Sequence, residues 1–383
     1  MDWVLLVIGG FGFLGMMGLG SILAPVFMAL GRNTGMPLGH APTVQEVSRI
    51  EILVPVHNEE WHLSQTLSSI GDAVRVLQAG HPGVQVLIRV GLDACTDASS
   101  QIANAHGCEV QSYHFKSKWR VLIALVAQSR GDWVLWVDAG VYWPRQFLAN
   151  AWALLGRSNV VGVAPAYWVA RPGRLTEWIW AVERRMKRWE SLDLGGPVSV
   201  HGATVFYRLS ALREVIRHLD QVGEGEGTSW VVEDVVIPLV MRTLYPGHQI
   251  LYWEGSESGD RLVDQGVQGS AHALERRKRI VLGNLQWVRW ILPWVFRTNF
   301  WVGVLALRRV FRLLWGYWIL AVLVALLYRG LGILGTTLVG AGVLVLVMLD
   351  WVPRTVQKGA FLTSLRTPFY YLSGQDLDPI QWS

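Results

Sequence analysis

The chain of 383 residues has few charged side chains, which make up 16% of it against about 25% in a soluble globular domain. It has only two cysteines, Cys95 and Cys108, which excludes a disulfide framework and favours a reducing compartment for the region around them. The net charge of +5 is too small to indicate a nucleic-acid-binding protein. Hydrophobic residues make up 51% of the chain, which excludes a disordered chain and predicts that part of it lies in lipid.

Charged side chains are almost missing from two segments near the ends of the chain. Residues 1–31 carry only Asp2, and residues 330–349 carry none. About 20 apolar residues suffice to cross a bilayer, so we predict an N-terminal transmembrane helix over 1–31 and two further spans over 313–351. A cleaved signal peptide is the alternative for the first segment, but it would begin with basic residues.

Basic residues flank the two C-terminal spans and predict their orientation. By the positive-inside rule, residues 44–282 and a tail over 352–383 lie in the cytoplasm of a multi-pass inner (plasma) membrane protein. Residues 283–312 are apolar but contain Arg289, Pro293 and Arg297, so we expect an interfacial helical segment there. Whether 287–304 spans the membrane or lies on it stays open. The flanking basic residues are Arg308, Arg309 and Arg312 before the spans, and Arg354, Lys358 and Arg366 after them.

The region between residues 44 and 282 alternates short β-rich runs with helical patterns. This rhythm predicts an α/β fold with a parallel sheet and helices on both faces, in which ligands bind beyond the carboxyl ends of the strands. The predicted strands are Glu51–Val56, Val84–Val90 and Trp133–Val137, and the predicted helices are Trp61–Ala79, Ser99–Ala105 and Trp119–Ser129.

Acidic residues follow each of the three predicted strands. Glu59 comes after the first strand, Asp93 after the second and Asp138 after the third. We therefore expect several carboxylates around one crevice, where a cation or a donor-rich ligand offsets their repulsion. The alternative is that they are ordinary turn residues, because Asp and Asn are common in turns.

The motifs in this region resemble those of glycosyltransferase family 2 over about residues 50–290. The run VPVHNEE is similar to the family's V-P-x-x-N-E opening, and DACTD is similar to its D-x-x-T-D segment. Lys118 precedes Asp138 at the family's lysine-to-D-x-D distance, HGATVF is similar to its acceptor-side segment, and Val232-Glu233-Asp234 resembles its T-E-D motif. The resemblance implies a Rossmann-like GT-A fold that binds a nucleotide sugar.

The resemblance also implies roles for the nucleotide-sugar-binding residues. Asp93 is expected to accept a hydrogen bond from the base, and Lys118 to neutralise diphosphate charge. Asp138 is the expected ligand of a divalent cation, Mg²⁺ or Mn²⁺. The second Asp of D-x-D is replaced by Gly140, which leaves two alternatives: a third ligand such as His201 completes the metal site, or Lys118 and arginines replace the metal. The residues expected to line the nucleoside are Pro55, His57 and Glu59.

Asp234 is the candidate general base, because the valines on either side of its pair with Glu233 favour a raised carboxylate pKa. The alternative is an acid pair that stabilises a helix start. Glu233, Gly202 and Ala203 are assigned to the acceptor side by resemblance. Arg276 and Arg279 fall at the place of the family's Q-x-x-R-W motif and are expected to bind diphosphate. A literal match at Gln286–Trp290 and a basic helix edge at the membrane are the alternatives for that region.

Together these features predict a membrane-bound inverting glycosyltransferase. The expected donor is a UDP-linked sugar, and the expected acceptor is a lipid or another molecule at the membrane surface, in glycolipid or cell-envelope polysaccharide synthesis. The alternatives are a processive polysaccharide synthase, for which three spans are few, and an inactive sugar-nucleotide-binding assembly subunit, suggested by Gly140. A transporter is disfavoured because the predicted spans contain no charged residue other than Asp2, Arg329 and Asp350, which lie at their ends. The identity of the sugar, of the acceptor and of any partner subunit stays open.

Overall fold

The computed structural model describes residues 45–169, 174–222, 229–255, 261–264 and 273–313, together with residue 332. The chain divides into two compact units, residues 34–267 with 379–383 and residues 268–378 with 1–33. The predicted transmembrane segment 1–31, nearly all of the predicted spans over 313–351 and the tail 352–383 lie outside the described residues. Among the helices that are described, none combines the length and the hydropathy needed to cross a membrane.

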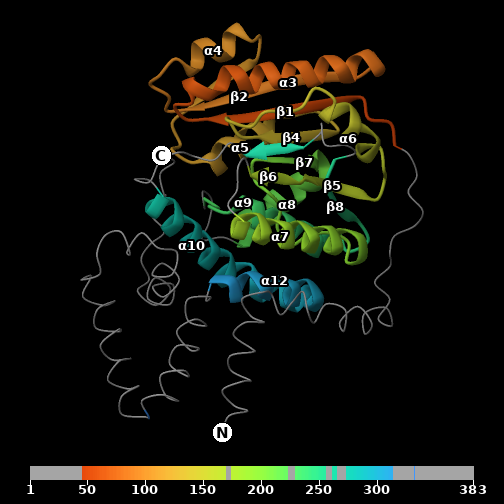
Figure 1. The fold of residues 1–383 in the computed structure, drawn as a ribbon, viewed down its shortest axis with the longest axis vertical. Helices are drawn as coiled ribbons and strands as arrows, with labels where there is room; N and C mark the ends of the chain where they lie inside the picture. The colour runs from red at the N-terminus through yellow and green to blue at the C-terminus, as the bar shows by residue number, and fades with distance from the viewer. Residues whose placement is uncertain are drawn as a thin grey trace. The chain divides into compact units, whose positions relative to one another are not determined.

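A seven-stranded mixed sheet forms the centre of the first unit, with the strand order β3-β2-β1-β4-β7-β5-β8 (Figure 1). Neighbouring strands are parallel except at β7, which is antiparallel to both β4 and β5. A separate two-stranded parallel sheet pairs β6 with β9. The strands are β1 (Arg49–Val56), β2 (Gln85–Asp93), β3 (Glu109–Tyr113), β4 (Trp133–Val137), β5 (Val160–Pro165), β6 (Tyr167–Val169), β7 (Thr204–Arg208), β8 (Gln249–Trp253) and β9 (Leu262–Asp264).

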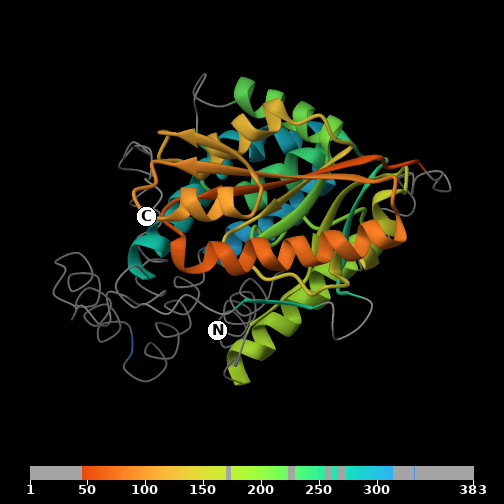
Figure 2. The same cartoon turned by 90° about the horizontal axis from the view of Figure 1, so that it is seen from above.

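Helices cover both faces of the large sheet, as predicted (Figures 1 and 2). On one face α3 packs against α4 and α6, and on the other α5 and α9 both pack against α8. The helix α7 contacts β8. The helices of this unit are α3 (Glu60–Gly80), α4 (Ser99–Ala105), α5 (Lys118–Gln128), α6 (Phe147–Leu155), α7 (Arg174–Asp193), α8 (Leu209–Val222) and α9 (Glu233–Leu244).

The period-2 alternation of β1 explains how the sheet buries both faces. Ile52 and Val54 belong to the core that also contains Leu63 and Ile70 of α3. Leu53, between them in sequence, is equally buried, and strand geometry directs its side chain to the opposite face. Such strands read as continuous apolar runs because neither face meets water.

The sheet departs from the predicted parallel arrangement at β7. No strand is predicted at Thr204–Arg208 from the sequence. In the structure this segment forms β7, which lies between β4 and β5 and is antiparallel to both. Its pairing with β4 runs from Trp133 opposite Arg208 to Val137 opposite Thr204. As a result the start of β7 lies beside the end of β4, which brings the segment before β7 to the carboxyl edge of the sheet.

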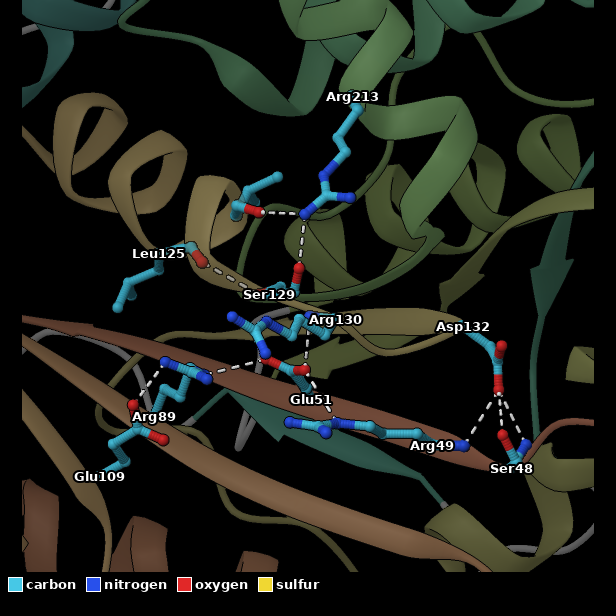
Figure 3. Close-up of polar contacts among 11 residues, drawn as sticks. Ser48, Arg49, Glu51, Arg89, Glu109, Leu125, Ser129, Arg130, Asp132 and Arg213 are labelled. Carbon is cyan, nitrogen blue, oxygen red and sulfur yellow. Dashed lines mark hydrogen bonds and ion pairs between the residues drawn. The ribbon is translucent and has the colours of Figure 1, made fainter.

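A buried ion-pair network joins four segments at the other edge (Figure 3). Glu51 of β1 is fully buried, and its carboxylate accepts hydrogen bonds from the Arg89 side chain of β2 at 2.9 Å and the Arg130 backbone N–H at 2.6 Å. It also pairs with Arg49 at 3.1 Å, and Arg89 reaches Glu109 of β3 at 2.6 Å. Because buried charges are stable only when paired, this network fixes β1, β2 and β3 relative to one another.

The described part of the second unit consists of three consecutive helices, α10 (Ala273–Trp290), α11 (Leu292–Thr298) and α12 (Phe300–Leu313). They pack on one another around the buried Trp287 and Val295. Gly303 lets α12 approach α11, because a Cβ there would lie 2.6 Å from the ring of Phe296. The predicted helical segment 283–312 is thus helical, with breaks at Ile291 and Asn299. Its expected position at a membrane surface stays a prediction.

Candidate active site

Six strands of the large sheet end at one edge, and β7 begins there. Because β7 is reversed, β1, β2, β3, β4, β5 and β8 all point the same way. His57 and Glu59 follow β1, Asp93 ends β2 and Asp138 follows β4. Ala203 directly precedes β7, and its carbonyl accepts a hydrogen bond from the Asp138 backbone N–H at 2.9 Å. The structure therefore brings these predicted donor-side residues together at one edge with the predicted acceptor-side residue Ala203.

Lys118 lies at the centre of this edge and joins two carboxylates from different parts of the chain. Its ammonium lies 2.7 and 2.9 Å from the two carboxylate oxygens of Asp138, and 2.7 Å from the Glu233 carboxylate. Burial lowers the pKa of Lys118, but the adjacent Asp138 and Glu233 carboxylates outweigh it and raise the pKa above its ordinary value. The lysine is therefore charged at every physiological pH. The predicted spacing of Lys118 and Asp138 is matched by direct contact.

Asp234, the predicted base, is the second residue of α9. The valines at 232, 235 and 236 are buried, so the apolar setting predicted for the acid pair is present. Gly202 packs directly against it, since a Cβ at residue 202 would lie 3.2 Å from the Asp234 Cβ. The Asp234 carbonyl accepts a hydrogen bond from the Val200 N–H at 2.8 Å. The segment before β7 therefore positions Asp234, with Gly202 beside the acid pair and Ala203 hydrogen-bonded to the Asp138 backbone.

Tyr207 marks the buried side of the same acid pair. Burial raises its pKa well above the ordinary value, and the negative charges of Asp234 and Glu233 add to the effect. Its hydroxyl is buried and makes no hydrogen bond. Tyr207 therefore stays neutral close to the two carboxylates. It is not among the residues predicted from the sequence.

Asp93 is fully buried, and its carboxylate holds the turn that leads into α5. Its two oxygens accept hydrogen bonds from the backbone N–H groups of Lys116 at 2.9 Å and Ser117 at 2.7 Å. Ser117 in turn caps α5 by accepting a hydrogen bond from the Arg120 N–H at 3.4 Å. The carboxylate predicted to read the base therefore also fixes the backbone directly before Lys118.

Left-handed backbone conformations cluster at the ends of the first three strands. Asn58, Ala94 and Lys116 have φ values of 54°, 50° and 52°, which non-glycine residues rarely adopt. The turns are tied together, because the Asn58 side chain accepts a hydrogen bond from the Thr96 N–H at 2.8 Å and the His57 ring contacts the Asp93 carbonyl at 2.6 Å. Such strain persists where surrounding contacts impose it, commonly at functional sites.

Glu59 and Pro55 belong to the first of these turns. Pro55 lies in β1 opposite Gly91, and the backbone N–H of Glu59 donates to the Ser99 hydroxyl at 3.0 Å. Burial raises the pKa of Glu59, opposed by the charge of His62 and assisted by that of Asp138. The carboxylate of Glu59 therefore lies within the electrostatic field of the Lys118 site. Its position agrees with a place in the predicted crevice.

Of the residues discussed for metal binding, Asp138 contacts Lys118, Gly140 has no side chain, and His201 lies against other groups. Gly140, at the second position of D-x-D, has a φ of 88°, and its N–H donates to the Thr66 hydroxyl at 2.9 Å. His201 is stacked on Trp180 and lies 3.3 Å from the ammonium of the buried Lys187. Over the described residues, no three His, Cys, Asp or Glu side chains are grouped to hold a metal ion.

Several site residues carry signals that the sequence analysis did not use. Ser117, directly before a helical run, is a typical N-cap, and its hydroxyl also contacts that of Ser229 at 2.6 Å. Asp97 accepts a hydrogen bond from the Glu60 N–H at 2.9 Å and so connects α3 to α4. Lys187 gives no such signal, because only the tertiary structure places it beside His201.

Arg276 and Arg279, predicted to bind diphosphate, lie on α10 in the second unit. The literal Q-x-x-R-W match at Gln286–Trp290 lies on the same helix. Trp287 of this match is fully buried, and its indole N–H donates to the Asn284 side chain at 3.0 Å. The diphosphate-binding role of the two arginines stays a prediction.

Comparisons with known proteins identify the fold. A mannosyltransferase from Pyrobaculum calidifontis, solved with GDP-Man and Mn²⁺, is similar to this chain with a TM-score of 0.63 at 16% identity, covering 97% of this chain and all of that one. Glucosyl-3-phosphoglycerate synthase from Mycobacterium tuberculosis, solved with Mn²⁺ and UDP, gives a TM-score of 0.41 at 17% identity, covering 61% of this chain and 78% of that one. No curated protein matches the chain in sequence.

The sequence match covers the part of the chain from β1 into α8, which includes predicted donor-side and acceptor-side residues. Residues 51–215 match the family described as Glycosyl transferase family 2. This range begins in β1, includes Asp93, Lys118, Asp138 and Gly202, and ends within α8. The predicted GT-A fold and the predicted enzyme class are confirmed. Residues 51–215 are therefore similar to glycosyl transferase family 2, and the chain is a glycosyltransferase.

Proposed function

We propose that this enzyme transfers a hexose from a UDP-linked donor to a hydroxyl of a lipid or another acceptor at a membrane surface, with inversion at the anomeric carbon. The observation that carries the proposal is the contact of Lys118 with both Asp138 and Glu233. Asp138 follows a strand of the donor half, and Glu233 begins the helix that carries the candidate base. A sugar between the two halves would have the donor phosphates on one side and the base on the other.

The chemistry follows from the positions of the carboxylates. Asp234 accepts the proton of the acceptor hydroxyl while the hydroxyl oxygen forms a bond to the anomeric carbon. The bond from that carbon to the diphosphate oxygen breaks, and UDP leaves with the electron pair. Since one displacement inverts the anomeric centre, no covalent sugar–enzyme intermediate forms.

Mn²⁺ or Mg²⁺, the predicted cofactor, would be held at Asp138. It would offset the negative charge that develops on the leaving diphosphate. Carboxylate oxygens suit either ion, and these ions usually take one or two protein carboxylates and complete their coordination with phosphate oxygens and water. The cation that Asp138 contacts in the structure is the ammonium of Lys118, so the carboxylate already faces a positively charged group.

The membrane-surface acceptor rests on the amino-acid sequence. The apolar segments 1–31 and 313–351 predict that the enzyme is tethered to the inner (plasma) membrane at both ends of its catalytic region. An enzyme held in this way meets lipid-borne hydroxyls at high local concentration.

The test is turnover by purified full-length chain with a panel of UDP-sugars and a lipid extract, measured as released UDP and as glycosylated lipid by mass spectrometry. Asp234→Asn is expected to lower kcat by about 10²–10⁴-fold at unchanged UDP affinity, because it removes only the base. Asp193→Asn, an exposed aspartate at the end of α7, is the matched control. NMR of the product should show the anomeric configuration opposite to that of the donor.

Other outcomes would favour the alternatives. Retained kcat in Asp234→Asn would reject this residue as the base. UDP binding without turnover of any donor would favour an inactive assembly subunit. A long polymer as product would favour a processive synthase.

A further inference from the structure

Two carboxylates converge on one cation at the centre of the site. The nitrogen of Lys118 lies within 2.7–2.9 Å of three oxygens, two from Asp138 and one from Glu233. The Glu233 side chain is 12% exposed and that of Asp138 is 35% exposed, so both carboxylates are partly shielded from solvent where they contact Lys118. The fold thus places three carboxylate oxygens around the Lys118 ammonium.

The same point is where a donor's divalent cation would lie. Family resemblance makes Asp138 one ligand, but the second D-x-D position is Gly140, which has no side chain. Its φ of 88° belongs to a backbone region that favours glycine, so the turn itself disfavours an aspartate there. A second protein carboxylate, where the ion takes one, would come from elsewhere in the chain, and the Glu233 carboxylate contacts the same Lys118 ammonium as Asp138.

We propose that Glu233 is the second protein ligand of the donor's divalent cation. Before the donor binds, the Lys118 ammonium occupies the position of this cation between Glu233 and Asp138. This inference rests on the proposed function, because it assumes a nucleotide diphosphate sugar as donor. A divalent ion between the two carboxylates balances their charge, and diphosphate oxygens and water supply its remaining ligands. Lys118, released from the carboxylates, is then available to the diphosphate.

The arrangement makes donor and metal binding mutually dependent. A divalent ion that approaches the site without nucleotide meets the Lys118 ammonium, which already contacts both carboxylates at 2.7 Å. A diphosphate attracts the ammonium away from the carboxylates and at the same time supplies ligands to the metal. The metal is therefore expected to bind far more tightly in the presence of UDP than in its absence, and the reverse holds by linkage.

The experiment measures Mn²⁺ binding to the purified full-length chain, with and without UDP, from the loss of the free Mn²⁺ signal in electron paramagnetic resonance. With UDP present, Glu233→Gln should weaken Mn²⁺ binding by about tenfold or more, an effect of the size that loss of a metal-site partner causes. Glu46→Gln, which changes an exposed glutamate, is the matched control. Without UDP, Lys118→Met should bind Mn²⁺ more tightly than the wild type, a gain that misfolding cannot produce.

Three results would separate the possible failures. If Glu233→Gln binds Mn²⁺ like the Glu46→Gln control while Asp138→Asn loses binding, Asp138 is the ligand and Glu233 serves only to orient Lys118, which overturns the proposal. If the wild type turns over donor in EDTA and binds no Mn²⁺ with UDP, the proposal fails and the proposed function survives. If the chain binds no UDP and turns over no UDP-sugar, the proposed function itself fails.

Discussion

Replacement of Glu51 by alanine tests how much the buried ion-pair network contributes to stability (Figure 3). The change leaves the Arg130 N–H without its acceptor and leaves Arg89 with Glu109 as its remaining partner. The Arg89 side chain is 9% exposed, so its charge is only weakly compensated by water, whereas Glu109 is 42% exposed. Stranding a buried charge in this way costs about 3–5 kcal/mol.

The cost converts into a measurable shift in thermal stability. For a unit of roughly 150–250 residues, each kcal/mol lowers Tm by about 2–4 °C, so Glu51→Ala should lower Tm by about 6–20 °C. Thermal unfolding of the full-length chain, followed by the fluorescence of buried tryptophans such as Trp133, measures the shift. Glu109→Ala removes the exposed end of the network and should cost only about 0–1 kcal/mol.

A double variant separates lost charge pairing from lost packing. Glu51→Leu combined with Arg89→Met replaces both charges with apolar groups of similar length, and such replacements are often neutral. The double variant should therefore recover most of the Tm that Glu51→Ala loses. The reasoning is refuted if Glu51→Ala lowers Tm no more than Glu109→Ala, because the network would then contribute no more than a surface pair.

Three further changes test other features of the first unit. Gly202→Ala should lower kcat while it changes Tm little. The reason is that its Cβ would lie 3.2 Å from the Asp234 Cβ and displace the base. Steady-state kinetics and thermal melting of the same preparation check this. Gly196→Ala should lower the free energy of unfolding by about 2 kcal/mol or more and should lower Tm accordingly. Its φ is 139°, and a Cβ there would lie 2.8 Å from Ile250. An unchanged Tm would contradict this packing. Glu59→Gln should raise Tm at neutral pH, because a carboxylate whose pKa is raised by burial destabilises the fold above its ordinary pKa. That gain should vanish as the pH falls towards about 4, where the wild type is protonated as well; a gain that is constant with pH would contradict it.

The sequence was sufficient for three of the four strands of the donor half, and only β3 was not predicted. The three predicted strands correspond to β1, β2 and β4, and the helix predicted at Ser99–Ala105 has the observed bounds. These elements are long or strongly patterned, and short turns connect them, so local signals determine them. The lysine-to-aspartate spacing also led to a real contact, because one helix and one strand link Lys118 to Asp138.

The acceptor half was beyond sequence reasoning for physical reasons. Strands β5, β7 and β8 have five or six residues each, and the buried ones show no alternation that separates them from helix. The reversal of β7 depends on a strand pairing between distant segments. The contact between Lys118 and Glu233 joins residues far apart in sequence, and no local pattern indicates which carboxylate a lysine selects.

The strand order places a natural boundary inside the sheet, between β4 and β7. On one side lie β3, β2, β1 and β4, which carry Asp93 and Asp138, and on the other lie β7, β5 and β8. The two sides join along a single pair of antiparallel strands. On the proposed function, an engineer who wishes to change the acceptor would graft loops onto the second side, or recombine it with that of a relative, while the side that carries Asp93 and Asp138 keeps its own scaffold. Evolution has the same freedom, and acceptor range can diversify without a new donor chemistry.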